Sequence, residues 1–134
     1  TALPDTGVDL LMGVGGAPEA VITAAAMKCL GGELQTKLSV RNEEDEARAD
    51  EAGFDDFDRV YSSEDLAHGD SLIFAATGIT DGDMLQGVRF YGPKATTESI
   101  VMRMLTGTVR RIRTTHDLSR KTLRSFRAGQ EMSL

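Results

Sequence analysis

An apolar run, a glycine cluster and an alanine-rich helix pattern follow one another early in the chain, and this succession constrains the fold most. Residues 8–14 read VDLLMGV, which is typical of a β-strand, and Gly15 and Gly16 follow as a turn. Residues 18–30 read PEAVITAAAMKCL, in which proline suits a first helical position. A helix that is apolar on almost every side is buried on most faces. The sequence therefore predicts a helix laid across a sheet, in an α/β fold.

Further strands and one acidic helix follow, separated by short turns. We expect strands at residues 33–40, 59–61, 71–76, 85–91, 95–105 and 108–116, and a helix at residues 43–52. The run 71–76 is the most strand-like and is expected to be central in its sheet. The last three strands are expected to pair antiparallel. This order predicts one α/β domain over residues 1–117 and a polar, basic, poorly ordered tail over residues 118–134.

Side chains that cap helices stand before two of the predicted helical segments. Asn42 precedes the acidic helix, in which Glu44 and Arg48 form an i,i+4 pair. Ser62 or Ser63 can cap a short turn that follows. Consecutive carboxylates on a helix point in different directions, so the acidic segment is predicted to be a solvated surface and not a metal site.

Composition indicates a globular protein of about one domain. The 134 residues are 40% hydrophobic and 27% charged, and no apolar run reaches the roughly 20 residues that span a bilayer. Cys29 is the only cysteine, and His68 and His116 are the only histidines, so a zinc cluster is not expected. The net charge of −6 argues against nucleic-acid binding. We expect a fragment, because the chain lacks an initiator methionine and begins inside structured sequence. With a single cysteine no intrachain disulfide can form, so we expect a cytoplasmic protein, with neither nucleic acid nor membrane as partner.

The segment MGVGGAPE at residues 12–19 holds the best candidate site. A strand, glycines and a helix N-terminus present free N–H groups and a positive dipole end to an anion. The glycine spacing fits neither a dinucleotide fingerprint nor a Walker A loop. Glu19 has two interpretations: a first-turn acid that offsets the helix dipole, or a carboxylate ligand to a divalent cation beside a bound phosphate.

Three stretches carry a family resemblance. They are PDTGVDLLMGVGGAPEAVITAAAMKCLGGELQTKL, GDSLIFAATGITDGDMLQGVRF and TTESIVMRMLTGTVRRIRTTH, in this order. The chain up to about His116 resembles class II fructose-1,6-bisphosphatases, although Ala20 stands where many members have glycine. The resemblance implies the C-terminal portion of the α/β sandwich shared by lithium-sensitive sugar and inositol phosphatases, a mixed β-sheet flanked by helices.

The resemblance also implies an activity and two site residues. Members use Mn²⁺ or Mg²⁺ to hydrolyse the 1-phosphate of fructose 1,6-bisphosphate, which gives fructose 6-phosphate and phosphate in gluconeogenesis and glycerol metabolism. Gly16 matches the glycine that contacts substrate, and Glu19 matches a metal-ligand carboxylate. The other metal ligands and the catalytic threonine lie upstream in the family, so no catalytic residue is expected in this chain. Residues 1–134 alone are expected to be inactive, with the N-terminal half of the same enzyme as partner, in a homo-oligomer.

Some other residues look functional, but a plainer interpretation fits them better. Residues 81–83 read DGD, like a substrate-binding motif of the family, yet they are expected to form a turn. Arg110, Arg111 and Arg113 are expected on an exposed strand face or a subunit contact, and His116 is expected to be structural. Two alternatives for the function stay open: a bifunctional fructose/sedoheptulose bisphosphatase, and an anion-binding or regulatory module without catalysis.

Overall fold

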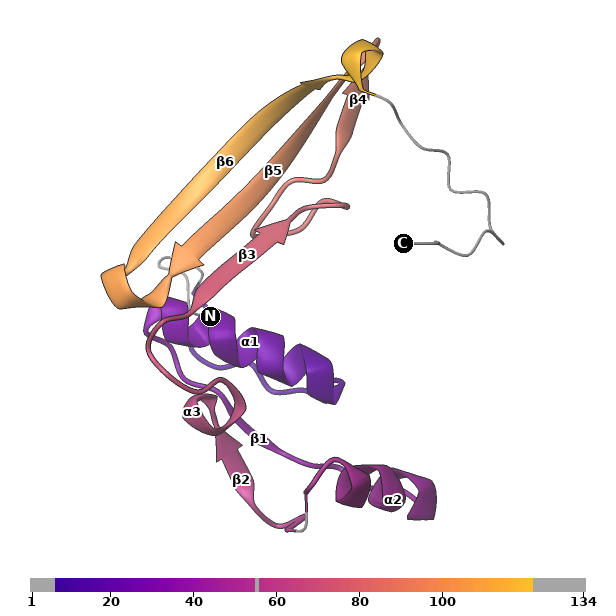
Figure 1. The fold of residues 1–134 in the computed structure, drawn as a ribbon, viewed down its shortest axis with the longest axis vertical. Coiled ribbons are helices and arrows are strands. Elements are labelled where there is room, and N and C mark those ends of the chain that lie inside the picture. Colours follow the sequence, from indigo (N-terminus) through magenta and orange to yellow (C-terminus); the bar gives the residue numbers. More distant parts are fainter. Residues whose placement is uncertain (1–6, 55, 122–134) are drawn as a thin grey trace. The chain divides into compact units, whose positions relative to one another are not determined.

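The computed structural model describes residues 7–54 and 56–121 (Figure 1). Contacts divide the chain into two units, and the division crosses the strands of one sheet. The first unit comprises Thr1–Ala75 and Val101–Arg110, and the second comprises Ala76–Ile100 and Arg111–Leu134. In the described ranges, none of the helices combines the length and the hydropathy needed to cross a bilayer.

The alanine-rich pattern forms α1, Ala17–Leu30, as predicted. Pro18 lies in its first turn, where a missing N–H costs no helical hydrogen bond. Gly31 ends the helix with φ of 73°, a left-handed conformation that a residue without Cβ adopts easily. The local sequence therefore sets both ends of α1.

The side chains of α1 are covered unequally. Ala24 is 0% exposed and Cys29 is 5% exposed, and the Cys29 Sγ lies 3.8 Å from the Met102 carbonyl oxygen. Val21 and Ile22 stay exposed on the same helix. The described residues thus bury one side of a helix that is apolar all round, which leaves the prediction of burial on most faces only partly fulfilled.

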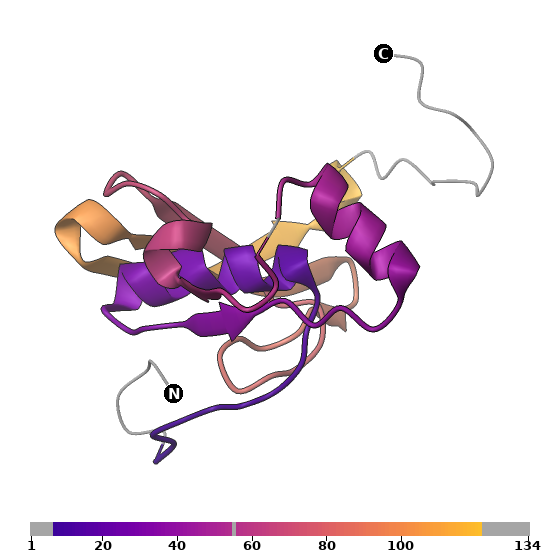
Figure 2. The same cartoon turned by 90° about the horizontal axis from the view of Figure 1, so that it is seen from below.

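The first unit also contains a small sheet and a contact between α1 and a short third helix. β1, Gln35–Lys37, pairs antiparallel with β2, Val60–Ser62. The chain continues at once into α3, Ser63–Leu66, which lies beside α1 in both views (Figures 1 and 2). Ser62 caps α3 through a complete capping box with Asp65, as the sequence predicted for this pair of serines.

The acidic helix forms as predicted. α2 is Glu43–Glu51, and the Asn42 side chain accepts a hydrogen bond of 2.8 Å from the Asp45 N–H. Arg48 donates to Glu44 across 2.6 Å. Only Ala49 is buried on this helix, so its carboxylates lie in solvent and contribute little to packing.

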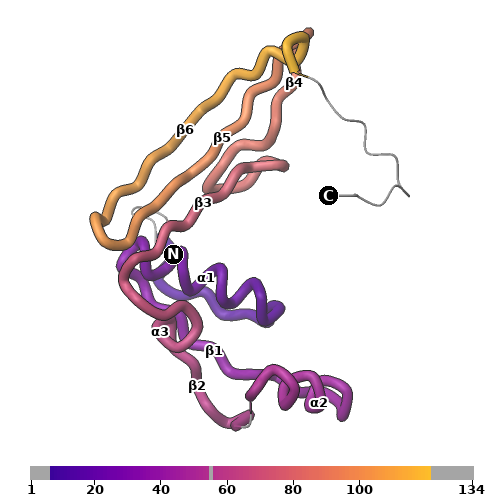
Figure 3. Tube along the Cα trace, viewed as in Figure 1, coloured from indigo at the N-terminus to yellow at the C-terminus, as the bar shows by residue number. Residues whose placement is uncertain are grey.

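The second sheet is built around β5, Lys94–Arg103. Its strand order is β3-β5-β4 with β6 paired to β5, where β3 is Ile73–Thr77, β4 is Arg89–Tyr91 and β6 is Thr108–Asp117. Figure 3 shows the chain reversing from β5 into β6 through η1, Met104–Thr106. Ile100 and Met102 are fully buried on one face of β5. A last turn of 3-10 helix, η2, covers Leu118–Arg120, and the remaining tail residues 122–134 lie outside the described residues.

The predicted strand at residues 8–14 is wrong. Residues 7–16 form neither helix nor strand, and Leu10, Leu11, Met12 and Val14 are 73–86% exposed. A strand needs a neighbour that pairs with its N–H and C=O groups, and an apolar pattern alone does not supply one. No described segment pairs with this run in the sheet topology.

Two predictions about the second sheet are also corrected. The run expected to be central forms β3, which pairs only with β5 among the described residues and so lies at an edge. The strand expected at residues 85–91 shortens to β4, because residues 79–88 fold into a loop held by its own hydrogen bonds. The molecule remains an α/β protein whose recorded strand pairs are antiparallel.

Glycines allow the 79–88 loop to close tightly. A Cβ at Gly87 would lie 2.8–2.9 Å from backbone atoms of Thr80, Asp81 and Ile79. Its N–H donates to the Asp81 carboxylate at 2.9 Å. Close backbone approach, and not a left-handed φ, is the reason for glycine at this position.

Replacing Gly87 with alanine should therefore destabilise the protein. Backbone atoms cannot yield to the new methyl group, so we expect a loss of about 1–3 kcal/mol in the free energy of unfolding. Gly82→Ala is the matched control, because its Cβ meets only the Leu85 carbonyl oxygen at 3.9 Å. It should change stability by less than about 0.5 kcal/mol in urea unfolding. Equal losses in the two variants would contradict the packing of this loop.

Candidate functional site

The corner formed by residues 13–19 leads directly into α1. Gly16 is the N-cap of α1, and its carbonyl oxygen accepts the first helical hydrogen bond, 3.1 Å from the Ala20 nitrogen. The N–H groups of Ala17 and Glu19 precede that bond, and Pro18 has none. The corner is exposed throughout in the described residues. It therefore offers free backbone donors at the positive end of a helix dipole.

Gly16 and Glu19, the two residues predicted for the site, lie against each other. The Glu19 carboxylate folds back over Gly16 and occupies the space that a Cβ at position 16 would take. Gly16 has φ of −76°, which any residue can adopt. The backbone of Gly16 therefore does not require glycine, and a Cβ there would meet only the movable end of the Glu19 side chain at close range.

A comparison within the chain shows what the Glu19 carboxylate does not do. Asp65 holds the same position in α3, the third of the helix, and there it accepts hydrogen bonds from the Ser62 N–H and hydroxyl at 2.9 and 2.7 Å. Those bonds hold the pKa of Asp65 below its ordinary value, with the Arg59 charge adding to the effect. Glu19 makes no such bond with the described part of the chain, so its oxygens remain available to a ligand.

Two neighbouring glycines have no explanation in the chain's own geometry. A Cβ at Gly13 or Gly15 would meet nothing within 4 Å, and neither has a positive φ. Glycine is useful at such places when another molecule approaches the backbone closely. The corner is thus open to a ligand on the side of residues 13–15.

Taken together, the corner can bind an anion through backbone N–H groups and a cation through one carboxylate. A divalent cation needs several oxygen ligands. Within residues 7–54 and 56–121, no group of three or more potential ligands is brought together. The Glu19 carboxylate alone therefore does not make a divalent-cation site within the described residues.

The sequence analysis missed a polar cluster around the Lys28 ammonium. The Lys28 side chain is 7% exposed, pairs with the Glu64 carboxylate, and donates to the Ala67 and Gly69 carbonyl oxygens at 2.8 and 2.9 Å. The Lys28 hydrogen bond is the main reason that the pKa of Glu64 lies below its ordinary 4.5. Every donor of the ammonium is used, so this cluster fixes α1 to α3. Lys28 is the only basic residue in an otherwise apolar helix pattern, which was the signal for a buried partner.

Asp81 of the DGD motif and His116, which look functional in the sequence, make contacts within the fold. Asp81 binds Arg89 through both carboxylate oxygens at 3.0 and 2.9 Å and lies in the 79–88 loop, as the turn interpretation requires. His116 contacts the Thr97 hydroxyl at 3.0 Å and the Lys121 ammonium at 2.7 Å. Cys29 is buried in the first unit, as expected of a small hydrophobic residue.

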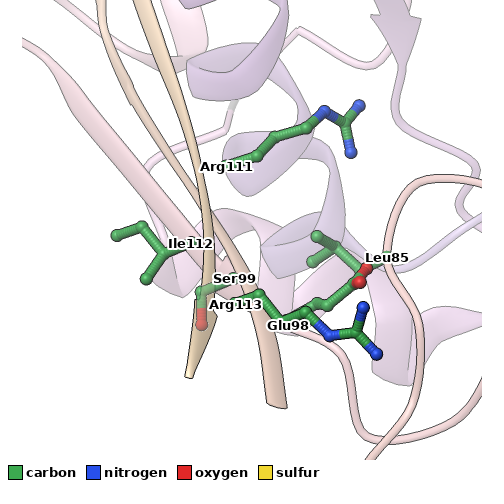
Figure 4. A pocket seen from close by; sticks show the side chains of 6 residues that line it. All are labelled: Leu85, Glu98, Ser99, Arg111, Ile112 and Arg113. Carbon is green, nitrogen blue, oxygen red and sulfur yellow. The ribbon is translucent and has the colours of Figure 1, made fainter. Parts of the chain in front are cut away.

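A shallow hollow of about 120 Å³ lies on the second unit. Figure 4 shows Arg111 and Arg113 extending to one side of β6 and Ile112 to the other. Arg111 donates to the Met84 carbonyl oxygen at 2.8 Å, and the Glu98 carboxylate accepts from the Gln86 N–H at 3.1 Å. The polar groups of this hollow hold the loop against the strands, which is a structural role. Arg110, Arg111 and Arg113 are exposed, as expected.

Comparisons with known proteins agree with one another. Residues 1–116 match the family model described as bacterial fructose-1,6-bisphosphatase, glpX-encoded. Two proteins of Synechococcus sp., from strains JA-3-3Ab and JA-2-3B'a(2-13), are each 44% identical over 123 residues. A protein of Crocosphaera subtropica (strain ATCC 51142 / BH68) is 43% identical over 123 residues. All three are named D-fructose 1,6-bisphosphatase class 2/sedoheptulose 1,7-bisphosphatase.

The matches cover this chain and the relatives very differently. They include 83% of this chain but only 35–36% of each relative. The chain spans about a third of the length of the curated relatives it matches.

The Lys28–Glu64 pair predicts a specific loss of stability in acid. Because folding lowers the pKa of Glu64 below 4.5, its stabilising contribution is complete above that pH and is lost as the pH falls through the folded value. We expect Glu64→Gln to show a smaller fall in urea midpoint than the unmodified protein between about pH 7 and about pH 3. Glu46→Gln, which removes the same charge from the exposed face of α2, is the control and should keep the full fall. An unchanged pH dependence in Glu64→Gln would contradict the anchoring role.

Proposed function

The chain belongs to the bacterial fructose-1,6-bisphosphatase family, and from this membership we propose that it is one part of a metal-dependent sugar-bisphosphate phosphatase. In this proposal the complete enzyme hydrolyses the 1-phosphate of fructose 1,6-bisphosphate to fructose 6-phosphate and phosphate. The contact between Gly16 and Glu19 carries the proposal, because it unites an anion-binding backbone and a cation-binding carboxylate at one helix start. This chain contributes no catalytic residue and is inactive alone.

We assign Gly16 to substrate binding and Glu19 to the metal. Gly16 lies beside the free N–H groups at the start of α1, which suit a phosphate oxygen once the Glu19 carboxylate turns from Gly16 to the cation. The Glu19 residue is exposed and its carboxylate has no hydrogen bond among the described residues, so ligation of a cation breaks no hydrogen bond. A phosphate and a cation held side by side neutralise each other's charge, which favours binding both together.

The donor type at this corner fits Mn²⁺ or Mg²⁺. Both prefer oxygen ligands, and one exposed carboxylate is a partial ligand set for such an ion. A bound divalent ion in a phosphatase supplies an activated water and stabilises negative charge on the phosphoryl group. The residues of this chain hold and orient: Glu19 binds the ion, the backbone from Gly16 to Glu19 binds a phosphate oxygen, and Lys28 fixes α1 so that these groups stay in place.

The remaining features of the enzyme follow from the same proposal. The rest of the polypeptide supplies the other metal ligands and the catalytic groups, and the whole adopts the α/β sandwich of the lithium-sensitive sugar phosphatases. The chain's apolar surface agrees with that, since Leu11, Met12 and Ile22 are 79%, 86% and 58% exposed here. We place the enzyme in the cytoplasm, as a homo-oligomer in gluconeogenesis and glycerol metabolism.

A bifunctional enzyme is the second candidate. The names of the three relatives combine fructose 1,6-bisphosphatase with sedoheptulose 1,7-bisphosphatase. In the proposed site the corner binds a phosphate and a metal ion. Neither contact depends on the length of the sugar, so the corner suits either substrate. Assaying the complete polypeptide on both sugars separates the two. A regulatory module without catalysis is the outcome if the complete polypeptide hydrolyses neither.

Glu19→Gln in the complete polypeptide tests the assignment of Glu19. The amide keeps the shape but loses the charge that binds the cation, so we expect half-maximal Mn²⁺ activation to need at least about 10-fold more metal, with turnover reduced by orders of magnitude. Part of the rate should return at high Mn²⁺. As a mere first-turn acid, Glu19 would contribute only about 0.3–1 kcal/mol to stability, and turnover would stay normal.

The matched control is Glu43→Gln, which removes a first-turn carboxylate from α2. It should shift stability slightly and leave the Mn²⁺ titration unchanged. A normal metal-activation curve for Glu19→Gln would reduce Glu19 to a helix-start residue. The same shift in both variants would point to a general charge effect.

A further inference from the structure

One edge of β3 is open, and two hydrogen bonds define which groups it presents. The Gly78 N–H donates to the Glu98 carbonyl oxygen at 2.9 Å, and the Met104 N–H donates to the Leu72 carbonyl oxygen at 3.0 Å. These bonds bracket β3 and show that it runs antiparallel to β5. In an antiparallel pair, successive residues alternate between bonding the partner and pointing away from it.

The register follows from those two bonds. Positions 72 and 78 bond to β5, so Phe74 and Ala76 do the same in between. The N–H and C=O groups of Ile73, Ala75 and Thr77 point to the opposite side. Among the described residues, β3 has no second strand there. Six backbone groups, one N–H and one C=O on each of the three residues, are therefore offered to another strand.

The composition of β3 does not suit an edge left in water. Its sequence is IFAAT, without charge or proline, and Ile73 is 66% exposed. Natural sheets protect open edges with charged side chains, prolines or bulges, because bare apolar edges pair with other chains. An uncharged strand of this kind is typical of a position between two others.

β6 provides the contrast inside the same sheet. It also pairs only with β5 in the described part of the chain, on the other side from β3. It carries Arg110, Arg111 and Arg113 within ten residues, which is the protection expected of an edge in solvent. The sheet thus has one edge suited to water and one suited to a partner strand.

We propose that the open edge of β3 receives a strand from the part of the polypeptide that lies outside the matched third of the relatives. This rests on the proposed function, in which the chain is one part of a longer bisphosphatase. The chain covers only 35% of its relatives, so most of the polypeptide is available as occupant. The added strand bonds to Ile73, Ala75 and Thr77, and it is apolar on both faces to match the uncharged side chains of β3.

Hydrogen exchange resolved to single amides in the complete polypeptide tests the proposal. We expect the amides of Ile73, Ala75 and Thr77 to exchange at least about 100-fold more slowly than exposed amides, as Phe74 and Ala76 do through β5. Fast exchange at the three odd-numbered positions, with protection at the two even ones, would overturn it. Protection that rises with protein concentration would also overturn it, since the occupant would then be a second copy.

A proline variant tests the same edge through stability. Ala75→Pro removes one N–H on the open side and leaves the bonds to β5, so a true edge tolerates it. We expect it to lower the urea midpoint of the complete polypeptide far more than Ala75→Gly, which keeps the N–H. Equal effects of the two variants would count against a paired edge.

Neither measurement needs catalysis, which keeps this inference separate from the proposed function. If the amides of Ile73, Ala75 and Thr77 are protected in a polypeptide without phosphatase activity, the strand pairing is supported and the proposed function is wrong. If the polypeptide has bisphosphatase activity and the same three amides exchange fast, the proposed function is supported and the strand pairing is wrong. Loss of protection on deleting residues 8–14 would place the partner strand within this chain and would overturn the proposal that it comes from the rest of the polypeptide.

Discussion

The Lys28 ammonium fixes α1 to the segment around α3, and the candidate site lies at the start of α1. α1 buries only small side chains such as Ala24 and Cys29, which contact many neighbours weakly and do not fix an orientation. Lys28 bonds the Glu64 carboxylate and two carbonyl oxygens after α3, and these directional bonds do fix it. The Gly16–Glu19 corner lies at the other end of the same rigid helix. A polar anchor at one end of α1 therefore keeps the proposed metal ligand in place at the other.

Several large apolar side chains of this chain are exposed to solvent. Side chains such as Leu11, Met12 and Ile73 are 66–86% exposed, although each belongs to a segment that reads as buried. The proposal that the chain is one part of a longer enzyme accounts for this exposure, because about two thirds of each relative lies outside the match. The same explanation covers the corner, which has one carboxylate where a divalent cation needs several ligands, and the β3 edge, which lacks a neighbour.

Local patterns in the sequence predicted the helices well and the pairing of strands poorly. Pro18, Asn42 and Gly31 define helix ends through bonds within a few residues, so α1 and α2 begin and end close to where they were expected. Whether a strand is central or at an edge depends on distant segments, which explains the errors at residues 8–14 and at β3. The site residues came from a family resemblance. The contact between Gly16 and Glu19 and the bonds of Lys28 depend on how the chain folds, so the sequence alone did not predict them.

The most direct test of Glu19 as a metal ligand is a crystal structure of the complete polypeptide grown with Mn²⁺. Anomalous scattering locates the metal in such a crystal. We expect an anomalous peak at coordination distance from a Glu19 carboxylate oxygen. The other ligands should come from residues outside this chain, and the backbone of Gly16 should face the phosphate position. A manganese ion bound entirely by other carboxylates, with Glu19 still folded over Gly16 and away from the metal, would contradict it.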